Sequence, residues 1–210
     1  MKLTTEQITL ITEYLEWCGI KYIDVKFELI DHVATDVEQL MTAEGFSYDL
    51  ALKKAMEKFY PLFYKEKSFH VGLVYTFPKI VIKKMEAKIK KAYLPVVISL
   101  AIFALFTFVI KIDFSVSERL NYVINSISAI IGMCILLILI TVNYKSKPTT
   151  YRFLVNHSSP ILLFSLFIYS FNSEINLLKI YYLVLVVVQF VFMVVNFKNH
   201  IQCVKKYKLA

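Results

Sequence analysis

The sequence predicts an all-α membrane protein in three parts: a cytoplasmic three-helix N-terminal module, a basic juxtamembrane helix and a four-helix transmembrane bundle. Three observations predict this fold class. Hydrophobic residues make up 58% of the chain and charged residues 19%, whereas soluble domains average about 45–50% and about 25%. The mean hydropathy is +0.59. The excess of hydrophobic residues is also distributed unevenly along the chain, because residues 1–66 carry 12 of the 16 acidic residues.

The bundle is predicted from four uncharged segments rich in Ile, Leu, Val and Phe. The uncharged stretches are 92–110, 120–144, 153–173 and 180–197. Each is close to the 17–25 residues that a spanning helix needs, and we place the four spans at about 92–110, 121–143, 153–173 and 177–197. Lysine and arginine number 13 on one side of these spans and 3 on the other. Because cytoplasmic loops are enriched in basic residues, we expect both termini, including a basic tail over 198–210, in the cytoplasm.

Residues 67–91 form a basic segment before the first span, with seven lysines and one acid, Glu86. We expect an amphipathic helix that Pro78 starts or interrupts, with Ile80, Ile82, Met85 and Ile89 as its apolar contacts. The segment suits an anchor that fixes the topology. A lipid-sensing role, in which lysines attract an anionic leaflet, is the other interpretation.

Residues 1–66 are predicted to form the three-helix module. Thr4 and Gln7 have the spacing of a capping box, and Gly19 ends that first helix. The second helix covers about 24–43 and is expected to stop at Gly45. Its apolar residues fall on one stripe: Ile23, Phe27, Ile30, Ala34, Val37 and Met41. The third helix begins after Ser47, a predicted N-cap, and ends at Tyr60-Pro61.

A polar row lies opposite the Ile30 stripe of the second helix. Glu28, His32 and Asp36 are spaced i, i+4, i+8, and Gln39 extends the row. Three interpretations stay open: a metal site, which lacks a second His or Cys; a plain surface array of charges; and a docking surface for another protein. We take Glu28, His32, Asp36 and Gln39 as candidate docking residues.

The same region resembles a family of bacterial helical domains. The residues that carry the resemblance are Glu28-Leu29-Ile30-Asp31-His32-Val33, Glu44-Gly45-Phe46-Ser47, Ala51, Ala55 and Phe59. This pattern, over about residues 4–60, resembles HAAS-type signalling domains and permease-prefix domains, although Tyr60 stands where the pattern has Gly. The resemblance implies a cytoplasmic helical module fused to membrane helices of the bacterial inner membrane. It also implies association with PadR-like regulators or export permeases, and no catalytic residue.

Asp, Glu, Lys and Arg are absent from the uncharged stretches of the predicted spans, but uncharged polar side chains are present. His157, Ser158, Ser159 and Gln189 form a candidate intramembrane polar site, because polar groups in spans are costly and often functional. We expect a kink at Pro160, with Ser and Asn side chains satisfying the freed backbone groups, and a hydrogen bond from Gln189 to a neighbouring helix. Whether His157 is a ligand or a structural residue stays open. Ser128 and Gly132 suit close helix packing.

The remaining patterns exclude several functions. No nucleophile elbow, phosphate loop or metal-ligand spacing is present, so we expect no enzyme activity, no cofactor and no metal. The N-terminal module is acidic and only two residues are Arg, which argues against nucleic acid. His70 and His200 are expected to be lone surface residues. We expect regulation or signalling through protein contacts. The alternative is an accessory or membrane subunit of a transporter, and a homo-oligomer is compatible with either.

Overall fold

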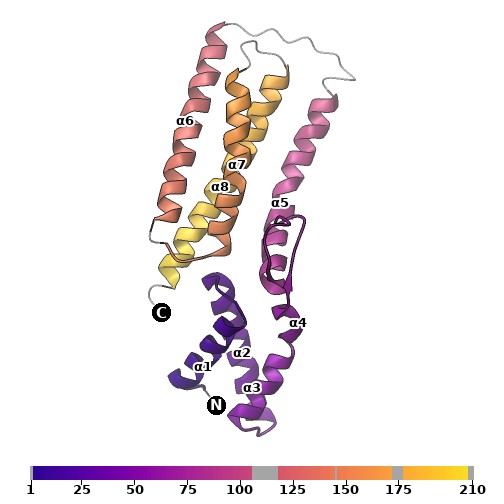
Figure 1. The fold of residues 1–210 in the computed structure, drawn as a ribbon, viewed down its shortest axis with the longest axis vertical. Helices are drawn as coiled ribbons and strands as arrows, with labels where there is room; N and C mark the ends of the chain where they lie inside the picture. The colour runs from indigo at the N-terminus through magenta and orange to yellow at the C-terminus, as the bar shows by residue number, and fades with distance from the viewer. Residues whose placement is uncertain (1, 106–117, 145, 172–176, 208–210) are drawn as a thin grey trace. The chain divides into compact units, whose positions relative to one another are not determined.

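The computed structural model describes residues 2–105, 118–144, 146–171 and 177–207 (Figure 1). Over these ranges the chain forms helices and one pair of very short strands, which confirms the mostly helical fold class. The chain divides into two compact units. The first comprises Met1–Ala87 together with Lys147–Thr150, and the second comprises Lys88–Ser146 and Tyr151–Ala210.

The first unit contains the three predicted helices. They are α1 (Thr5–Trp17), α2 (Ile23–Ala43) and α3 (Tyr48–Glu57), and α2 packs against both of the others. Thr4 and Gln7 make both hydrogen bonds of the predicted capping box. Gly19 and Gly45 follow α1 and α2 with φ of 84° and 66°, a conformation that glycine adopts without a Cβ clash. Both predicted helix stops are therefore confirmed.

The core of this unit follows the predicted stripes with some additions. Ile11 and Leu15 of α1 are fully buried, and Ala51 and Ala55 of α3 are likewise inaccessible. On α2 the predicted stripe is buried only in part: Ile23, Ile30 and Val37 are buried, whereas Phe27, Ala34 and Met41 are half-buried. Leu29 and Val33 are also buried and widen the apolar face on one side. A wider apolar face is what a helix needs when it contacts neighbours on two sides.

The exit of the third helix differs from the prediction. Ser47 precedes α3 in extended backbone, but its side chain makes no capping hydrogen bond. Helix α3 ends at Glu57, and Pro61 lies in the first turn of a separate four-residue helix, α4 (Tyr60–Phe63). Proline is well suited to a first turn, where its missing N–H has no helical partner. Pro61 therefore starts a helix where we expected it to end one.

Two short strands precede the basic helix and were not predicted. Strand β1 (Lys65–Glu66) pairs antiparallel with β2 (Phe77–Pro78). Helix α5 (Lys79–Ala104) begins directly after Pro78, which confirms that this proline starts the helix. Residues 67–76 form a connection between the strands, so the helical part of the predicted 67–91 segment is limited to Lys79 onward. Ile82, Met85 and Ile89 are buried, as expected for its apolar face.

The second unit contains the rest of α5 together with α6 (Glu118–Asn143), α7 (Thr150–Phe171) and α8 (Leu177–Lys206). Figure 1 shows α6, α7 and α8 running side by side, and one hydrophobic cluster joins them. Ile135, Leu162 and Met193, one from each helix, are completely buried in it. Ser128 is buried, and a Cβ at Gly132 would lie 3.7 Å from the Leu166 side chain. The small pair thus lies at a helix contact, as predicted.

Two of the described helices are long and apolar enough to cross a membrane. They cover Asn121–Asn143, with a mean hydropathy of 2.7, and Tyr182–Lys206, with 1.8. In each, only 17% of the most apolar window is buried, so most of its apolar surface faces outward, unlike the core helix of a soluble protein. The described residues therefore support two of the four predicted spans. The ends of the other two, 106–110 and 172–173, lie outside the described residues, as do residues 111–117 and 174–176 of the connecting loops.

The C-terminal end of α8 also differs from the prediction. We expected a span ending at 197 and a separate basic tail from 198. The helix instead continues without interruption to Lys206. His200, predicted to lie on the surface, is 1% exposed, because helical continuation turns it inward.

Candidate functional site

A buried carboxylate organises the polar contacts of the first unit. Asp24, in the first turn of α2, is 6% exposed. Its Oδ1 accepts the backbone N–H of Thr150 at 2.9 Å, and its Oδ2 accepts the Thr150 hydroxyl at 2.5 Å. Thr150 is the first residue of α7, so Asp24 satisfies an N–H that has no partner within that helix. A carboxylate is also favoured at this end of the helix dipole.

Lys84 completes this cluster from α5. Its Nζ lies 3.6 Å from the Asp24 Oδ2 and 2.5 Å from the Glu28 Oε2, and it donates to the Asp24 carbonyl at 3.0 Å. The Ile23 N–H donates to the Pro148 carbonyl at 3.0 Å. The segment Lys147–Thr150 is therefore held on the first turn of α2 by both backbone and side-chain bonds. Thr149 and Thr150 are fully buried there.

The predicted polar row of α2 lies along one side of the helix, and two of its four members form ion pairs with lysines. Glu28 binds Lys84, and Asp36 binds Lys58 at 2.8 Å. His32 and Gln39 are exposed between and beyond them. The two carboxylates are therefore neutralised by lysines of neighbouring segments and do not converge on His32. Groups of three or more His, Cys, Asp or Glu side chains that could hold a metal ion are absent from the part of the chain that the structure describes.

A second polar network closes the α6–α7 turn within the second unit. Arg152 donates to the Ser146 carbonyl at 2.6 Å and to the Asn143 Oδ1 at 3.2 and 3.3 Å. Asn143 and Asn156 exchange hydrogen bonds at 2.9 and 3.0 Å. The His200 Nε2 lies 2.7 Å from the Ser146 Oγ. The sequence did not indicate this contact of His200, because the predicted span ends at residue 197 and α8 continues to Lys206.

Pro160 lies inside α7, as predicted, and the polar residues beside it satisfy the backbone. A proline leaves the carbonyl four residues earlier, here that of Asn156, without its helical donor. The Ser159 hydroxyl donates to this carbonyl at 2.9 Å, which confirms the predicted role of a serine at this position. The Ser158 hydroxyl donates to the Val155 carbonyl at 3.1 Å. Both serines are therefore engaged by their own helix.

The other two candidate polar residues, His157 and Gln189, line one small cavity. It has a volume of about 100 Å³, and its walls come from α5, α7 and α8. The His157 ring stacks on Phe153 with centroids 5.6 Å apart. The buried Oε1 of Gln189 has no hydrogen-bond partner among the described residues. The predicted bond to a neighbouring helix is therefore wrong for this oxygen, although Ser158 also lines the cavity.

Burial raises the pKa values of two ionisable groups at the end of α1. Burial raises the pKa of the Cys18 thiol, and it also raises the pKa of the Tyr14 hydroxyl, together with hydrogen bonds to Tyr60 and Cys18. A raised pKa keeps the thiol protonated and unreactive near neutral pH. Cys18, Cys134 and Cys203 take part in no disulfide within the described residues. These features indicate a structural role for the end of α1.

Comparison of the chain with protein families, with curated proteins and with solved structures gives no match. The class of protein that the structure itself defines is a mostly helical protein with an N-terminal helical unit, in which two of the described helices are long and apolar enough to span a membrane.

Proposed function

We propose that this chain is a four-span protein of the bacterial inner membrane whose cytoplasmic N-terminal module regulates or signals through contacts with another protein. The two candidate spans support the membrane location. The other two spans are proposed from the uncharged segments 92–110 and 153–173, and the orientation is proposed from the distribution of basic residues. The likeness of residues 4–60 to HAAS-type domains points to the same class.

One observation carries the signalling role: α2 has a contact surface on one side and holds a membrane-helix connection at its start. The row of Glu28, His32, Asp36 and Gln39 lies along the helix. Asp24, one turn before this row, binds the first residue of α7. A protein bound to the row therefore acts on the element that fixes the connection between α6 and α7. Such an arrangement can couple binding to a change in the membrane helices.

The topology is tested by reporter fusions. A fusion after Ala210 and a fusion near Phe114 are expected to report opposite sides of the membrane, with the C-terminal reporter on the cytoplasmic side. A C-terminal reporter on the periplasmic side would overturn the proposed orientation. A fusion after Tyr144 provides an internal control, because the proposed topology places it on the same side as the C-terminus.

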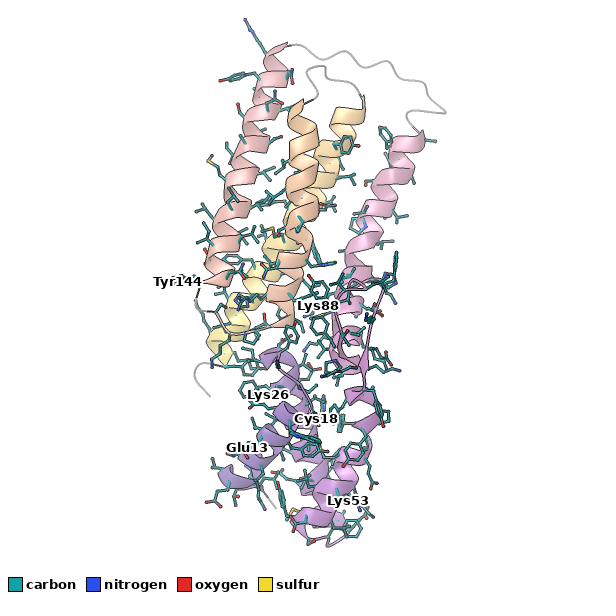
Figure 2. All side chains as sticks on the ribbon, in the orientation of Figure 1. Glu13, Cys18, Lys26, Lys53, Lys88 and Tyr144 are labelled. Carbon is teal, nitrogen blue, oxygen red and sulfur yellow. The ribbon has the colours of Figure 1, made fainter. Side chains whose placement is uncertain are left out.

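The docking surface is tested by crosslinking and pull-down from cells. Because Glu28 and Asp36 pair with lysines, their reversal would also break intramolecular ion pairs. The sharper variant is His32→Ala/Gln39→Ala, and the matched control is Lys53→Ala/Glu57→Ala, an exposed pair on α3 (Figure 2 labels Lys53).

The α2 variant is expected to lose a cytoplasmic partner that the control retains. Recovery of the same partners by both variants would refute the docking surface on α2. Recovery of a transporter subunit as the partner would replace signalling with an accessory role in transport.

A further inference from the structure

A groove between α5 and α8 differs from the cavity at His157 in size and in charge. Its volume is about 540 Å³, which lies within the range of ligand pockets, about 300–1,000 Å³. It shares the wall formed by Ala92, Val188 and Phe192 with the smaller cavity. All its lining residues belong to the second unit.

The groove is polar at one end and apolar along the rest of its length. Lys88, Lys91 and Asn199 lie at the polar end, and Pro95, Val187 and Val191 line the apolar part. None of its described lining residues is acidic. The Lys88 Nζ lies 3.3 Å from the centroid of the Tyr151 ring, a cation–π contact that holds the ammonium at the rim. Figure 2 labels Lys88 on α5. Lys91 is exposed one helical turn further on.

The dimensions of the groove match one leaflet of a bilayer. Along α8 it extends from Val187 to Asn199, which is about 18 Å at 1.5 Å per residue. Half of a bilayer with its headgroups is about 20 Å. In the proposed topology the two lysines lie at the cytoplasmic surface, and the valines lie in the hydrocarbon. Headgroup and acyl chain of one lipid would therefore meet groups of the matching polarity.

We propose that this groove is a binding site for an anionic phospholipid of the cytoplasmic leaflet, with the phosphate between Lys88 and Lys91 and an acyl chain along Val187 and Val191. The proposal rests on the membrane location proposed above. Charge complementarity selects an anionic headgroup over a zwitterionic one. The apolar length distinguishes a lipid from a free phosphate, which would fill only the rim. The site gives the basic segment a specific ligand in addition to its role in topology.

The test is native mass spectrometry of the full-length chain, released from detergent micelles after titration with dioleoyl phosphatidylglycerol. Dioleoyl phosphatidylcholine and inorganic phosphate are the two comparison probes. The variant Lys88→Gln/Lys91→Gln removes the proposed headgroup contacts. Lys83→Gln/Lys90→Gln is the matched control, because it removes the same charge from the same helix at positions that do not line the groove.

We expect phosphatidylglycerol to bind the wild type in preference to both comparison probes. Loss of two lysines near the headgroup is expected to weaken this binding about 30-fold, whereas the control pair stays within about threefold. An equal loss in both pairs would overturn the proposal, since it would indicate diffuse attraction by the basic segment. Equal binding of phosphatidylcholine would overturn the headgroup assignment. Displacement of the lipid by inorganic phosphate would reassign the site to the free ion.

A steric variant keeps the proposal falsifiable if the lysine variant fails to fold. Val191→Trp fills the apolar part of the groove without changing charge, and Val194→Trp is its control, exposed on α8 but outside the groove. Helicity by circular dichroism identifies variants that fold. Unchanged phosphatidylglycerol binding by a folded Val191→Trp protein would refute the site. The reporter fusions separate this failure from a failure of the proposed function, because they test membrane location without lipid binding.

Discussion

Replacement of Asp24 by alanine is the change that tests the polar cluster of the first unit most directly. The variant removes the carboxylate that accepts hydrogen bonds from the buried N–H and hydroxyl of Thr150. Hydrogen bonds to charged groups contribute about 1.5–3 kcal/mol each, and removal of one partner of a buried pair costs about 3–5 kcal/mol. Lys84 keeps Glu28 as a partner, and Ile23 keeps its bond to Pro148. We therefore expect a local loss near the lower value, about 3 kcal/mol.

Amide hydrogen exchange of the full-length chain measures this loss where it occurs. An opening free energy lower by about 3 kcal/mol raises the exchange rate at Thr150 about 100-fold. Asp31→Ala is the matched control, because Asp31 is an exposed carboxylate of the same helix, and it is expected to leave the rate unchanged. Equal protection of Thr150 in the two variants would refute the role assigned to Asp24.

Three further predictions concern other parts of the chain. Ser159→Ala removes the donor to the carbonyl freed by the helical proline and is expected to lower the free energy of unfolding by about 1 kcal/mol in a melting experiment. Ser158→Ala is expected to have a smaller effect in the same experiment, because the carbonyl that Ser158 contacts is still within reach of a backbone donor. His200→Ala is expected to cost about 1–3 kcal/mol because it removes a buried side chain and its hydrogen bond with the Ser146 hydroxyl, and His32→Ala less than about 0.5 kcal/mol because His32 is exposed; equal melting temperatures would contradict this contrast. Since burial raises the pKa of Cys18, its contribution to stability is full below the unfolded pKa, about 8.5, and is lost as pH rises through the folded value. The wild type is therefore expected to lose more stability between pH 8 and pH 11 than Cys18→Ala does.

Much of the first unit could be predicted because local sequence signals determine where its helices begin and end. The Thr4 capping box and the glycines after α1 and α2 act within one helical turn, and the structure confirms them. The errors came from tertiary effects. The strand pair β1–β2 forms between segments separated by a ten-residue connection, and two-residue strands leave no periodic pattern. Pro61 could be placed at a helix boundary, but its local sequence does not determine on which side the helix lies.

The candidate sites show the same division between local and long-range information. The bond from Ser159 to the Asn156 carbonyl follows from the proline in sequence and was predicted. The role of Asp24 depends on Thr150, 126 residues away, and no pattern in one sequence connects them. Gln189 was assigned a partner because polar groups in membrane helices usually have one. Its oxygen instead has no hydrogen-bond partner among the described residues, and Gln189 lines a cavity together with His157 and Ser158.

The unbroken course of α8 fixes the rotational phase of the C-terminal lysines. The helix of 30 residues is about 45 Å long, so about 15 Å of it extends beyond a hydrocarbon core of about 30 Å. Lys198 and Lys205 are seven residues apart and therefore project on nearly the same side. The direction in which both lysines project is fixed relative to the apolar face that includes Val191, because all three residues belong to one continuous helix. Insertion of a single residue after Lys198 would turn Lys205 by about 100° while leaving composition and charge almost unchanged.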